Sequence, residues 1–133
     1  MVTPLPRVLV LEDDELMLEL YRCQFDMWAL PVECTWMSSA TEALKEIDSL
    51  RPQLLITDLS MPGVDGLQML QELESRPHLA DMKIVVVSGV QAEVIAARGG
   101  LSPRIDFLRK PVDFPWLRRC VTALVQGLQA EKR

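Results

Sequence analysis

The sequence predicts a doubly wound α/β domain, in which five helices surround a five-stranded parallel sheet. Five short aliphatic runs alternate along the chain with five longer segments of helical pattern. Strands separated by helices pair in parallel through right-handed crossovers. The most apolar run, residues 83–87 (KIVVV), is continuous and not alternating, as expected of a strand buried on both faces. For five strands we expect the order 2-1-3-4-5, which places the switch point between the first and third strands.

The N-terminal half predicts three strands and two helices. Residues 7–11 (RVLVL) form the first strand. A helix opens at residue 14 or 15 and reaches about residue 28, because acidic residues favour a first turn and a proline follows the end. Residues 32–36 (VECTW) alternate and predict an edge strand. Ser39 and Glu42 fit a capping box, so a helix should run from there to residue 50, before a third strand at residues 53–57.

The C-terminal half continues the alternation. We expect a helix over residues 66–75, a strand over 83–87 and a helix over 91–98 that stops at Gly99 and Gly100, where glycine suits a left-handed residue. Residues 105–108 predict the fifth strand, and residues 113–130 the last helix. Lys132 and Arg133 would complement the dipole at its C-terminal end.

Composition excludes several classes of protein. The chain has 133 residues, and we expect a single domain over 1–133 with its core at about 7–128. Hydrophobic residues make up 49% and charged residues 25%, as in an ordinary globular protein. The net charge of −5 argues against direct binding of nucleic acid. The longest aliphatic runs, at residues 8–11 and 84–87, are far too short to span a membrane.

Two further observations concern location. Residues 1–7 lack the apolar segment of a signal peptide. Cys23, Cys34 and Cys120 are odd in number and far apart, and no CxxC motif occurs. We expect reduced, half-buried thiols that pack in the core of a cytoplasmic protein, with neither a disulfide framework nor a zinc site.

Polar side chains follow four of the predicted strands, at the point where each ends. Because the carboxyl ends of parallel strands line the ligand crevice of such a sheet, these side chains should lie together. The first and third strands are neighbours in the proposed order, so their acids should converge, with the residues after the fourth and fifth strands beside them. The residues are Glu12, Asp13 and Asp14 after the first strand, Asp58 after the third, Ser88 after the fourth and Lys110 after the fifth.

This set of residues suggests phosphoryl chemistry. Crowded carboxylates repel one another and need a counter-charge, which Lys110 and a hard divalent cation could supply. Oxygen ligands without His or Cys favour Mg²⁺ over zinc or copper. A carboxylate such as Asp58, beside a metal and a lysine, is a plausible nucleophile towards phosphorus and would give an aspartyl phosphate. Mg²⁺, Lys110 and the Ser88 hydroxyl would then hold the three phosphoryl oxygens.

Each feature alone also has a purely structural explanation. The acids after the first strand could be a solvated helix start, and Asp58 could cap the following helix. Ser88-Gly89 could be only a turn, and Lys110-Pro111 could simply end a strand. The functional interpretation depends on all four groups falling at one edge of one sheet.

Four segments carry a resemblance to a known family. They are VLVLEDDE, LLITDLSMPGVDG, KIVVVSG and DFLRKP, in that order, with helices between them. With them, the chain closely resembles the receiver domain of two-component response regulators, over about residues 7–128. The resemblance implies the flavodoxin-like receiver fold. The spacing from Asp58 through Ser88 to Lys110 is typical of that family.

The resemblance implies roles for individual residues. Asp58 would be the phospho-acceptor, charged by a histidine kinase or a phosphotransfer protein. Glu12 and Asp13 would bind Mg²⁺ together with Asp58 and the main-chain carbonyl of Ser60, whereas Asp14 would cap a helix. Such a domain phosphorylates and dephosphorylates only itself, so we do not expect an enzyme with turnover.

Further roles concern the signal. Lys110 would contact the phosphoryl group, and the Lys110–Pro111 peptide bond would be cis. Ser88 resembles the residue that moves to bind the phosphoryl group, and Phe107 the aromatic residue that swings inwards with it. The output surface would then change by a population shift. It would serve a downstream protein or a phosphorylation-linked homodimer, with no direct contact to membrane or nucleic acid.

One departure and several alternatives remain. Where the family carries Gly-Ala before the last strand, this chain has Pro103-Arg104. The helix before that strand should therefore be short, and the sequence leaves open which partner the output surface serves. A degenerate receiver that only docks would share the fold. A flavin carrier would need a hydroxyl- and glycine-rich loop, and a haloacid-dehalogenase-type phosphatase a DxD pattern, where this chain has EDDE at residues 12–15. The chain could be a stand-alone regulator or the N-terminal receiver of a longer protein.

Overall fold

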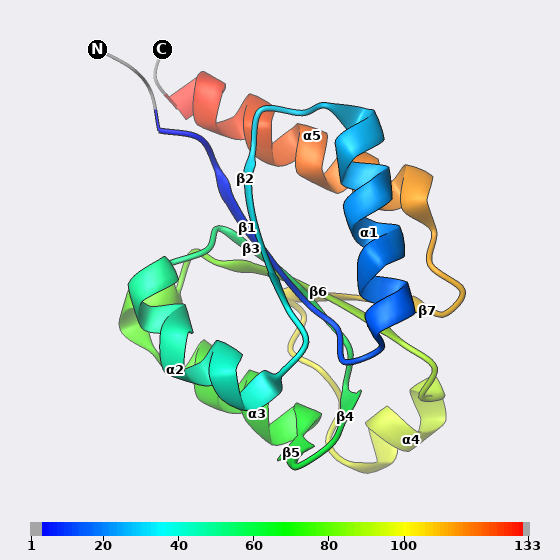
Figure 1. Ribbon diagram of the computed structural model, residues 1–133. Helices are drawn as coiled ribbons and strands as arrows, with labels where there is room; N and C mark the ends of the chain where they lie inside the picture. The colour runs from blue at the N-terminus through cyan, green and yellow to red at the C-terminus, as the bar shows by residue number, and fades with distance from the viewer. Residues whose placement is uncertain (1–3, 132–133) are drawn as a thin grey trace.

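The computed structural model describes residues 4–131 and has the predicted doubly wound architecture (Figure 1). The central sheet is parallel and has the order β2-β1-β3-β6-β7, which is the predicted order 2-1-3-4-5. Lys132 and Arg133, expected to complement the last helix, lie outside the described residues. The strands of the sheet are β1 (Arg7–Leu11), β2 (Glu33–Met37), β3 (Leu54–Thr57), β6 (Lys83–Ser88) and β7 (Ile105–Arg109).

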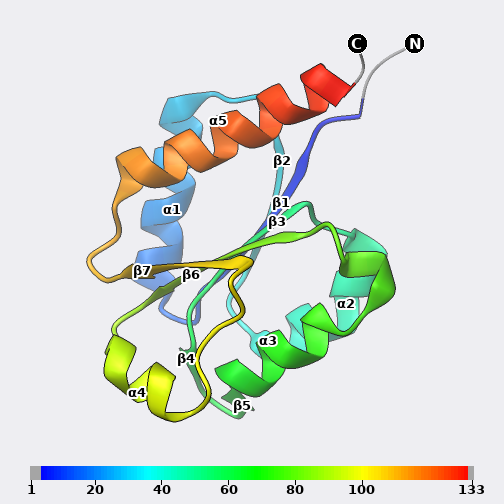
Figure 2. The same cartoon turned by 180° about the vertical axis from the view of Figure 1, so that it is seen from behind.

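Helices cover both faces of the sheet. In Figures 1 and 2, α1 and α5 lie together over one face, and α2 and α3 lie over the other. α4 contributes Ile95 to the same core cluster as α2 and α3. No helix of residues 4–131 is long and apolar enough to cross a bilayer. The helices are α1 (Glu15–Trp28), α2 (Ala40–Leu50), α3 (Gly66–Glu74), α4 (Ala92–Ala97) and α5 (Phe114–Glu131).

Two hydrophobic clusters explain why the central strands are continuous apolar runs. Alternate residues of a strand point to opposite faces of the sheet. Val8 and Val10 of β1 pack in the cluster with α1 and α5, whereas Leu9 and Leu11 pack in the cluster with α2 and α3. Both faces are covered by helices, so every position of β1 after Arg7 is buried.

The strand register brings the predicted functional residues to one edge. Leu11 pairs with Thr57, so Glu12 and Asp58 leave β1 and β3 at the same level. Ser88 pairs with Arg109, so Lys110 follows at the end of β7.

The structure contains two elements that the sequence did not predict. A two-stranded antiparallel hairpin, β4 (Ser60–Met61) and β5 (Val64–Asp65), follows Asp58. Its turn has Pro62 followed by Gly63 at φ 75°, the residue choice of a type II turn. A short 3₁₀ turn, η1 (Pro77–Leu79), precedes β6.

Some local predictions need correction. β2 begins and ends one residue later than expected, and α4 is shorter at both ends. Gly99 and Gly100 have the expected positive φ values of 103° and 74°. Cys34 and Cys120 are partly buried, but Cys23 is exposed on α1, so its prediction as a half-buried thiol was wrong.

Candidate functional site

The ends of β1, β3 and β7 meet at one charged cluster. The Nζ atom of Lys110 donates to Asp58 Oδ2 at 2.7 Å and to Glu12 Oε1 at 3.0 Å. Glu12 is only 2% exposed and Asp58 only 6%, whereas Lys110 is partly exposed. One ammonium group therefore bridges two buried carboxylates from neighbouring strands. Buried charges need such pairing, because an isolated ion away from water is very costly.

Main-chain groups fix the orientation of Asp58. Its Oδ1 accepts hydrogen bonds from the amides of Leu59 at 2.6 Å and Ser60 at 3.1 Å. The hydroxyl of Thr57 donates to the Asp58 carbonyl oxygen at 2.9 Å. The carboxylate is thus held at the tip of β3 by the turn that follows it.

The acids after β1 occupy three different environments. Glu12 Oε2 accepts from the amide of Asp14 at 3.3 Å. Asp14 is the N-cap of α1, since its Oδ1 accepts from the amides of Leu16 at 3.0 Å and Met17 at 3.3 Å, as predicted. Asp13 lies between them and is partly exposed. Only Glu12 of the three is buried.

The pKa values of the cluster follow from burial and pairing. Burial raises the pKa of Glu12, an effect that Lys110 opposes and the neighbouring Asp13 carboxyl reinforces, and the pKa stays above its ordinary value. Burial acts the same way on Asp58, but hydrogen bonds from Lys110, the Ser60 amide and the Ser88 hydroxyl outweigh it and hold that pKa below its ordinary value. For Lys110, burial lowers the pKa, but the hydrogen bonds that it donates to Asp58 and Glu12 outweigh burial, so its pKa is raised. Of the two buried carboxylates, Asp58 therefore stays ionised more readily than Glu12.

The remaining predicted residues lie on the β6 and β7 side of the site. Ser88 is fully buried at the end of β6, and its Oγ accepts from the amide of Val90 at 3.2 Å. Phe107 pairs with Val86 and packs half-buried against the core cluster of α2 and α3. The Lys110–Pro111 peptide bond is cis.

Three residues near the site were not identified from the sequence. Thr57 holds the Asp58 carbonyl oxygen, as above. A Cβ atom on Gly66 would overlap the carbonyl oxygen of Leu59, so the start of α3 packs directly against the residue after Asp58. The Asp-Gly pair at residues 65 and 66 indicates a turn, but it does not indicate this close contact. No feature of the sequence identified Tyr21. Burial raises the pKa of its hydroxyl group, and so do the negative charges of Glu12 and Asp58, so Tyr21 lies close enough to interact with both carboxylates.

Glu12 and Asp58 are joined to each other through Lys110. Within residues 4–131, no three His, Cys, Asp or Glu side chains are grouped in the arrangement of a metal site. The oxygen atoms at this edge are carboxylate and main-chain oxygens, which are the ligands that Mg²⁺ prefers.

Similarity to known proteins agrees with this geometry. Residues 8–122 match the sequence model of the response regulator receiver domain. The phosphate regulon transcriptional regulatory protein PhoB of Rhizobium meliloti (strain 1021) is 28% identical over 127 residues, covering 96% of this chain and 55% of that protein. The chain thus spans about half the length of this relative.

Solved structures show the same fold. A signal receiver domain of an HD domain-containing protein from Pseudomonas fluorescens Pf-5 superposes with a TM-score of 0.79 at 21% identity, covering 99% of this chain and 95% of that one. A CheY-like response regulator receiver domain protein from Methanospirillum hungatei JF-1 gives a TM-score of 0.74 at 21% identity, covering 96% and 98%.

Proposed function

Because this chain belongs to the response regulator receiver domain family, we propose that it accepts a phosphoryl group on Asp58. The donor is the phosphohistidine of a histidine kinase or a phosphotransfer protein. The product is an aspartyl phosphate that changes the output surface of the domain. The chemistry acts on the domain itself, so we propose no turnover of a separate substrate.

The single observation that carries this proposal is the Lys110 bridge between Asp58 and Glu12. A nucleophilic carboxylate must be ionised, and the lowered pKa of Asp58 keeps it so at neutral pH. The cation that lowers this pKa also lies where negative charge must be stabilised when a phosphoryl group arrives. Asp58 is only 6% exposed, so little of its surface is open to solvent.

The proposed transfer is a displacement at phosphorus. An oxygen of Asp58 forms the new bond to phosphorus, and the bond from phosphorus to the donor histidine nitrogen breaks. The electron pair stays on that nitrogen, which is then protonated. Lys110 and the Ser88 hydroxyl are placed to contact phosphoryl oxygens, since both already act on the Asp58 carboxylate.

The donor set fits Mg²⁺. We propose that Glu12, Asp13 and Asp58 hold the ion together with the carbonyl oxygen of Ser60. When bound, Mg²⁺ neutralises negative charge at the phosphoryl oxygens. Glu12 and Asp58 are both committed to Lys110 in this structure, so metal binding requires one of these hydrogen bonds to lengthen or to be shared.

The hairpin after Asp58 supports the role of the Ser60 carbonyl. Met61 and Val64 flank a two-residue turn, so they are the hydrogen-bonded pair of the hairpin. In an antiparallel ladder the next pair, Ser60 with Asp65, is then of the non-bonded kind, with main-chain groups that point outwards. The outward amide of Ser60 donates to Asp58 Oδ1, and its carbonyl points to the same side.

The output of the proposed switch is the region around α4. Ser88 would turn towards the phosphoryl group, and the half-buried Phe107 would move into the space it leaves. Such a change is a shift between two packings, driven by the new phosphoryl contacts. The downstream partner is a protein or a second copy of the chain.

The test uses acetyl phosphate as a small phosphodonor. The chain is incubated with acetyl phosphate and Mg²⁺, and intact mass is measured. We expect one added phosphoryl group on the wild type and none on Asp58→Asn or without Mg²⁺. Absence of label on the wild type, with the fold intact by circular dichroism, would leave a docking module without phosphorylation as the function. Equal labelling of Asp58→Asn would rule out Asp58 as the acceptor.

A further inference from the structure

The side chain of Arg98 ties the end of α4 to the hairpin that follows Asp58. Its Nη2 atom donates to Asp65 Oδ2 at 2.5 Å. Asp65 is the last residue of β5 and the N-cap of α3, because its Oδ1 accepts from the amides of Leu67 at 3.1 Å and Gln68 at 3.3 Å. One carboxylate therefore holds the start of α3 with one oxygen and the end of α4 with the other.

The hairpin extends this contact to Asp58. In Figures 1 and 2 the hairpin lies between α3 and α4. Asp65 pairs with Ser60 across its two strands. The amide of Ser60 in turn donates to Asp58 Oδ1 at 3.1 Å. Only two residues, Asp65 and Ser60, thus separate the Arg98 guanidinium group from the Asp58 carboxylate.

The hairpin is too small to keep its shape unaided. β4 and β5 have two residues each, and an isolated two-stranded hairpin is only marginally stable in water. Its geometry must therefore be fixed at its two ends. At the first end, the amides of Leu59 and Ser60 are bound to Asp58, and at the second end Asp65 is bound by α3 and by Arg98. A change at the second end should therefore move the main chain of Ser60.

We propose that Arg98 is a positioning residue for the phosphorylation site, and that it acts through Asp65 and the hairpin on the main chain of Ser60. That main chain supplies the amide that orients Asp58 and the carbonyl oxygen proposed as a ligand of Mg²⁺. The inference rests on the proposed function for the metal. It adds a second connection between Asp58 and α4: the Ser88 hydroxyl acts at the beginning of the segment, and Arg98 acts at its end.

The exposure of the ion pair sets the size of the expected effect, and its charge sets a test of the sign. The Arg98 side chain is 52% exposed and that of Asp65 34%, and so exposed a pair changes an equilibrium by about fivefold at most. Loss of a positive charge near a metal site, by itself, makes Mg²⁺ bind more tightly. Loss of positioning makes it bind more weakly. The substitution Arg98→Gln therefore separates the two explanations by the direction of the change.

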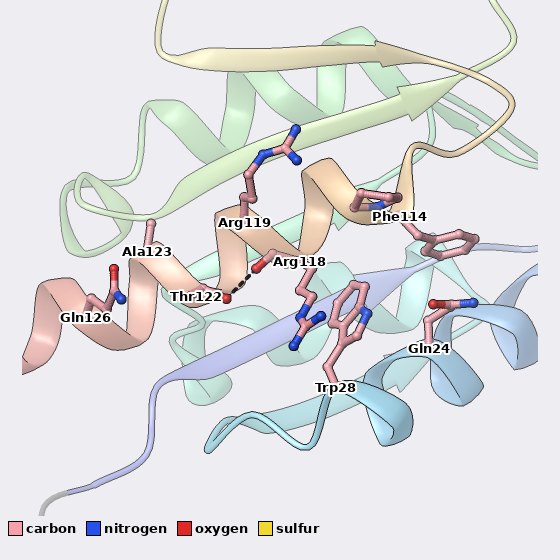
Figure 3. Close-up of a pocket in the computed structure, with 9 residues that line it drawn as sticks. Gln24, Trp28, Phe114, Arg118, Arg119, Thr122, Ala123 and Gln126 are labelled. Atoms are coloured by element: carbon pink, nitrogen blue, oxygen red, sulfur yellow. Dashed lines mark hydrogen bonds between the residues drawn. The ribbon is translucent and has the colours of Figure 1, made fainter.

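The first test needs no metal. NMR measures the exchange of the Ser60 amide with water in the unphosphorylated chain without Mg²⁺. We expect about two- to fivefold faster exchange in Arg98→Gln, because the bond from this amide to Asp58 is held less firmly. Arg118→Gln is the matched control and should leave the exchange unchanged. It removes the same charge from α5, where Arg118 lines a groove of about 710 Å³ between α1 and α5, beside Trp28 (Figure 3). Equal exchange in Arg98→Gln and the wild type would overturn the proposal.

The second test is a titration with Mg²⁺, followed by the NMR shifts of the Leu59 and Ser60 amides at about 0.15 M salt, which screens distant charges. We expect Arg98→Gln to raise the Mg²⁺ dissociation constant about two- to fivefold. Arg104→Gln is the control within the same segment, because its guanidinium group bonds to the carbonyl oxygen of Ala80 and not to the hairpin. It should leave the affinity unchanged. Unchanged or tighter binding in Arg98→Gln, or an equal loss in Arg104→Gln, would overturn the proposal.

A double-mutant cycle tests the path through Asp65. Asp65→Asn can keep the cap of α3 with its amide oxygen, but its NH₂ group then faces Arg98 and cannot accept a hydrogen bond. This variant should bind Mg²⁺ at least as weakly as Arg98→Gln. Adding Arg98→Gln to Asp65→Asn should cause no further loss, because both substitutions remove one and the same interaction. A further loss in the double variant would mean that Arg98 acts by another route, and the proposed path would be wrong.

The failure of this inference and the failure of the proposed function give different results. A wild type that takes no label from acetyl phosphate would contradict the proposed function, and the measurements on Arg98→Gln would still decide the role of Arg98. A wild type that binds no Mg²⁺ would contradict the proposed metal site, and the exchange of the Ser60 amide alone would then decide. An Arg98→Gln variant that behaves as the wild type in both tests would contradict only the role of Arg98 and leave Asp58 as the acceptor.

Discussion

At the ends of β1 and β3, charged side chains are buried and held by several hydrogen bonds. Between the end of β6 and the end of α4, few side chains are buried. We call the first region, with Glu12, Asp58 and Lys110, the acidic half of the site; there Lys110 joins Asp58 to Glu12, and two amides hold Asp58. In the α4 half, residues 88–100, α4 has only six residues and buries only Ile95. Its Val94 is 51% exposed, and two glycines with positive φ end the helix.

This difference matches two requirements of the proposed phosphorylation switch. For the proposed transfer, the acidic half must hold a nucleophile and its counter-charge in fixed positions before the phosphoryl group arrives. The α4 half must change its packing for a small energetic cost, and segments with few buried contacts open most easily. The chain therefore combines a rigid chemical half with a weakly held half that can respond to it.

The largest effect should come from breaking the buried charge cluster. Lys110→Met leaves Glu12 and Asp58 close together without a counter-charge, and it should lower the free energy of unfolding by about 3 kcal/mol. Urea denaturation at neutral pH without Mg²⁺ measures this. Lys83→Met is the matched control, because the Lys83–Asp106 pair is exposed and should contribute less than about 1 kcal/mol. Equal losses for the two variants would show that the acidic half is no more tightly held than the surface.

A second test exchanges a glycine in each half. Gly66→Ala places a methyl group against the main chain of Leu59, which cannot move without moving Asp58. We expect a loss of about 2 kcal/mol in the free energy of unfolding, and slower phosphorylation by acetyl phosphate.

Gly89→Ala is the corresponding change in the α4 half. No atom lies within 4 Å of a Cβ at this position. The substitution should change stability by less than about 0.5 kcal/mol, as on most surfaces. A tolerated Gly66→Ala would show that the loop after Asp58 can shift without cost, and that the acidic half is less rigid than we infer.

The sequence predicted the acidic half better than its surroundings, for physical reasons. Continuous apolar runs, helix caps and the strand order together brought Glu12, Asp58 and Lys110 to one edge, because register follows from which residues are buried. The β4–β5 hairpin was missed, since its strands have only two residues each and carry no periodicity. The contact between Gly66 and Leu59 depends on tertiary packing, and so does the exposure of Cys23.

A third test measures a single buried hydroxyl in the α4 half. Ser88→Ala removes the acceptor of the Val90 amide, and it should lower the free energy of unfolding by about 1 kcal/mol. Hydrogen exchange should become faster mainly in residues 89–97, with a smaller effect at the amides that hold Asp58, because the Ser88 hydroxyl also acts on that carboxylate. Ser102→Ala is the control, because the Ser102 hydroxyl makes the same kind of bond to the amide of Arg104 but in an exposed position. Faster exchange throughout the sheet would mean that the two halves open together.

The smallest expected effect comes from an ion pair that joins the two halves. Asp65 caps α3, just after the hairpin that follows Asp58, and its other oxygen accepts from Arg98 at the end of α4. The bond from Arg98, and then the amides of Gln68 and Leu67, hold the pKa of Asp65 below its ordinary value of 3.8. Because the folded-state pKa is lowered, this pairing stabilises the fold above pH 3.8 and is lost as the pH falls through the lowered value.

An NMR titration of the Leu67 and Gln68 amides measures this pKa directly. In the wild type the midpoint should lie below 3.8, and in Arg98→Gln it should move up towards that value without reaching it, because the two capping amides remain. The difference in stability between the two proteins should disappear at acid pH. Asp65→Asn keeps the cap, since asparagine caps as well as aspartate, and should show no titration. If Arg98→Gln leaves the midpoint unchanged, α4 is not tied to the start of α3, and the α4 half is held by the burial of Ile95 and by the bond between Ser88 and Val90.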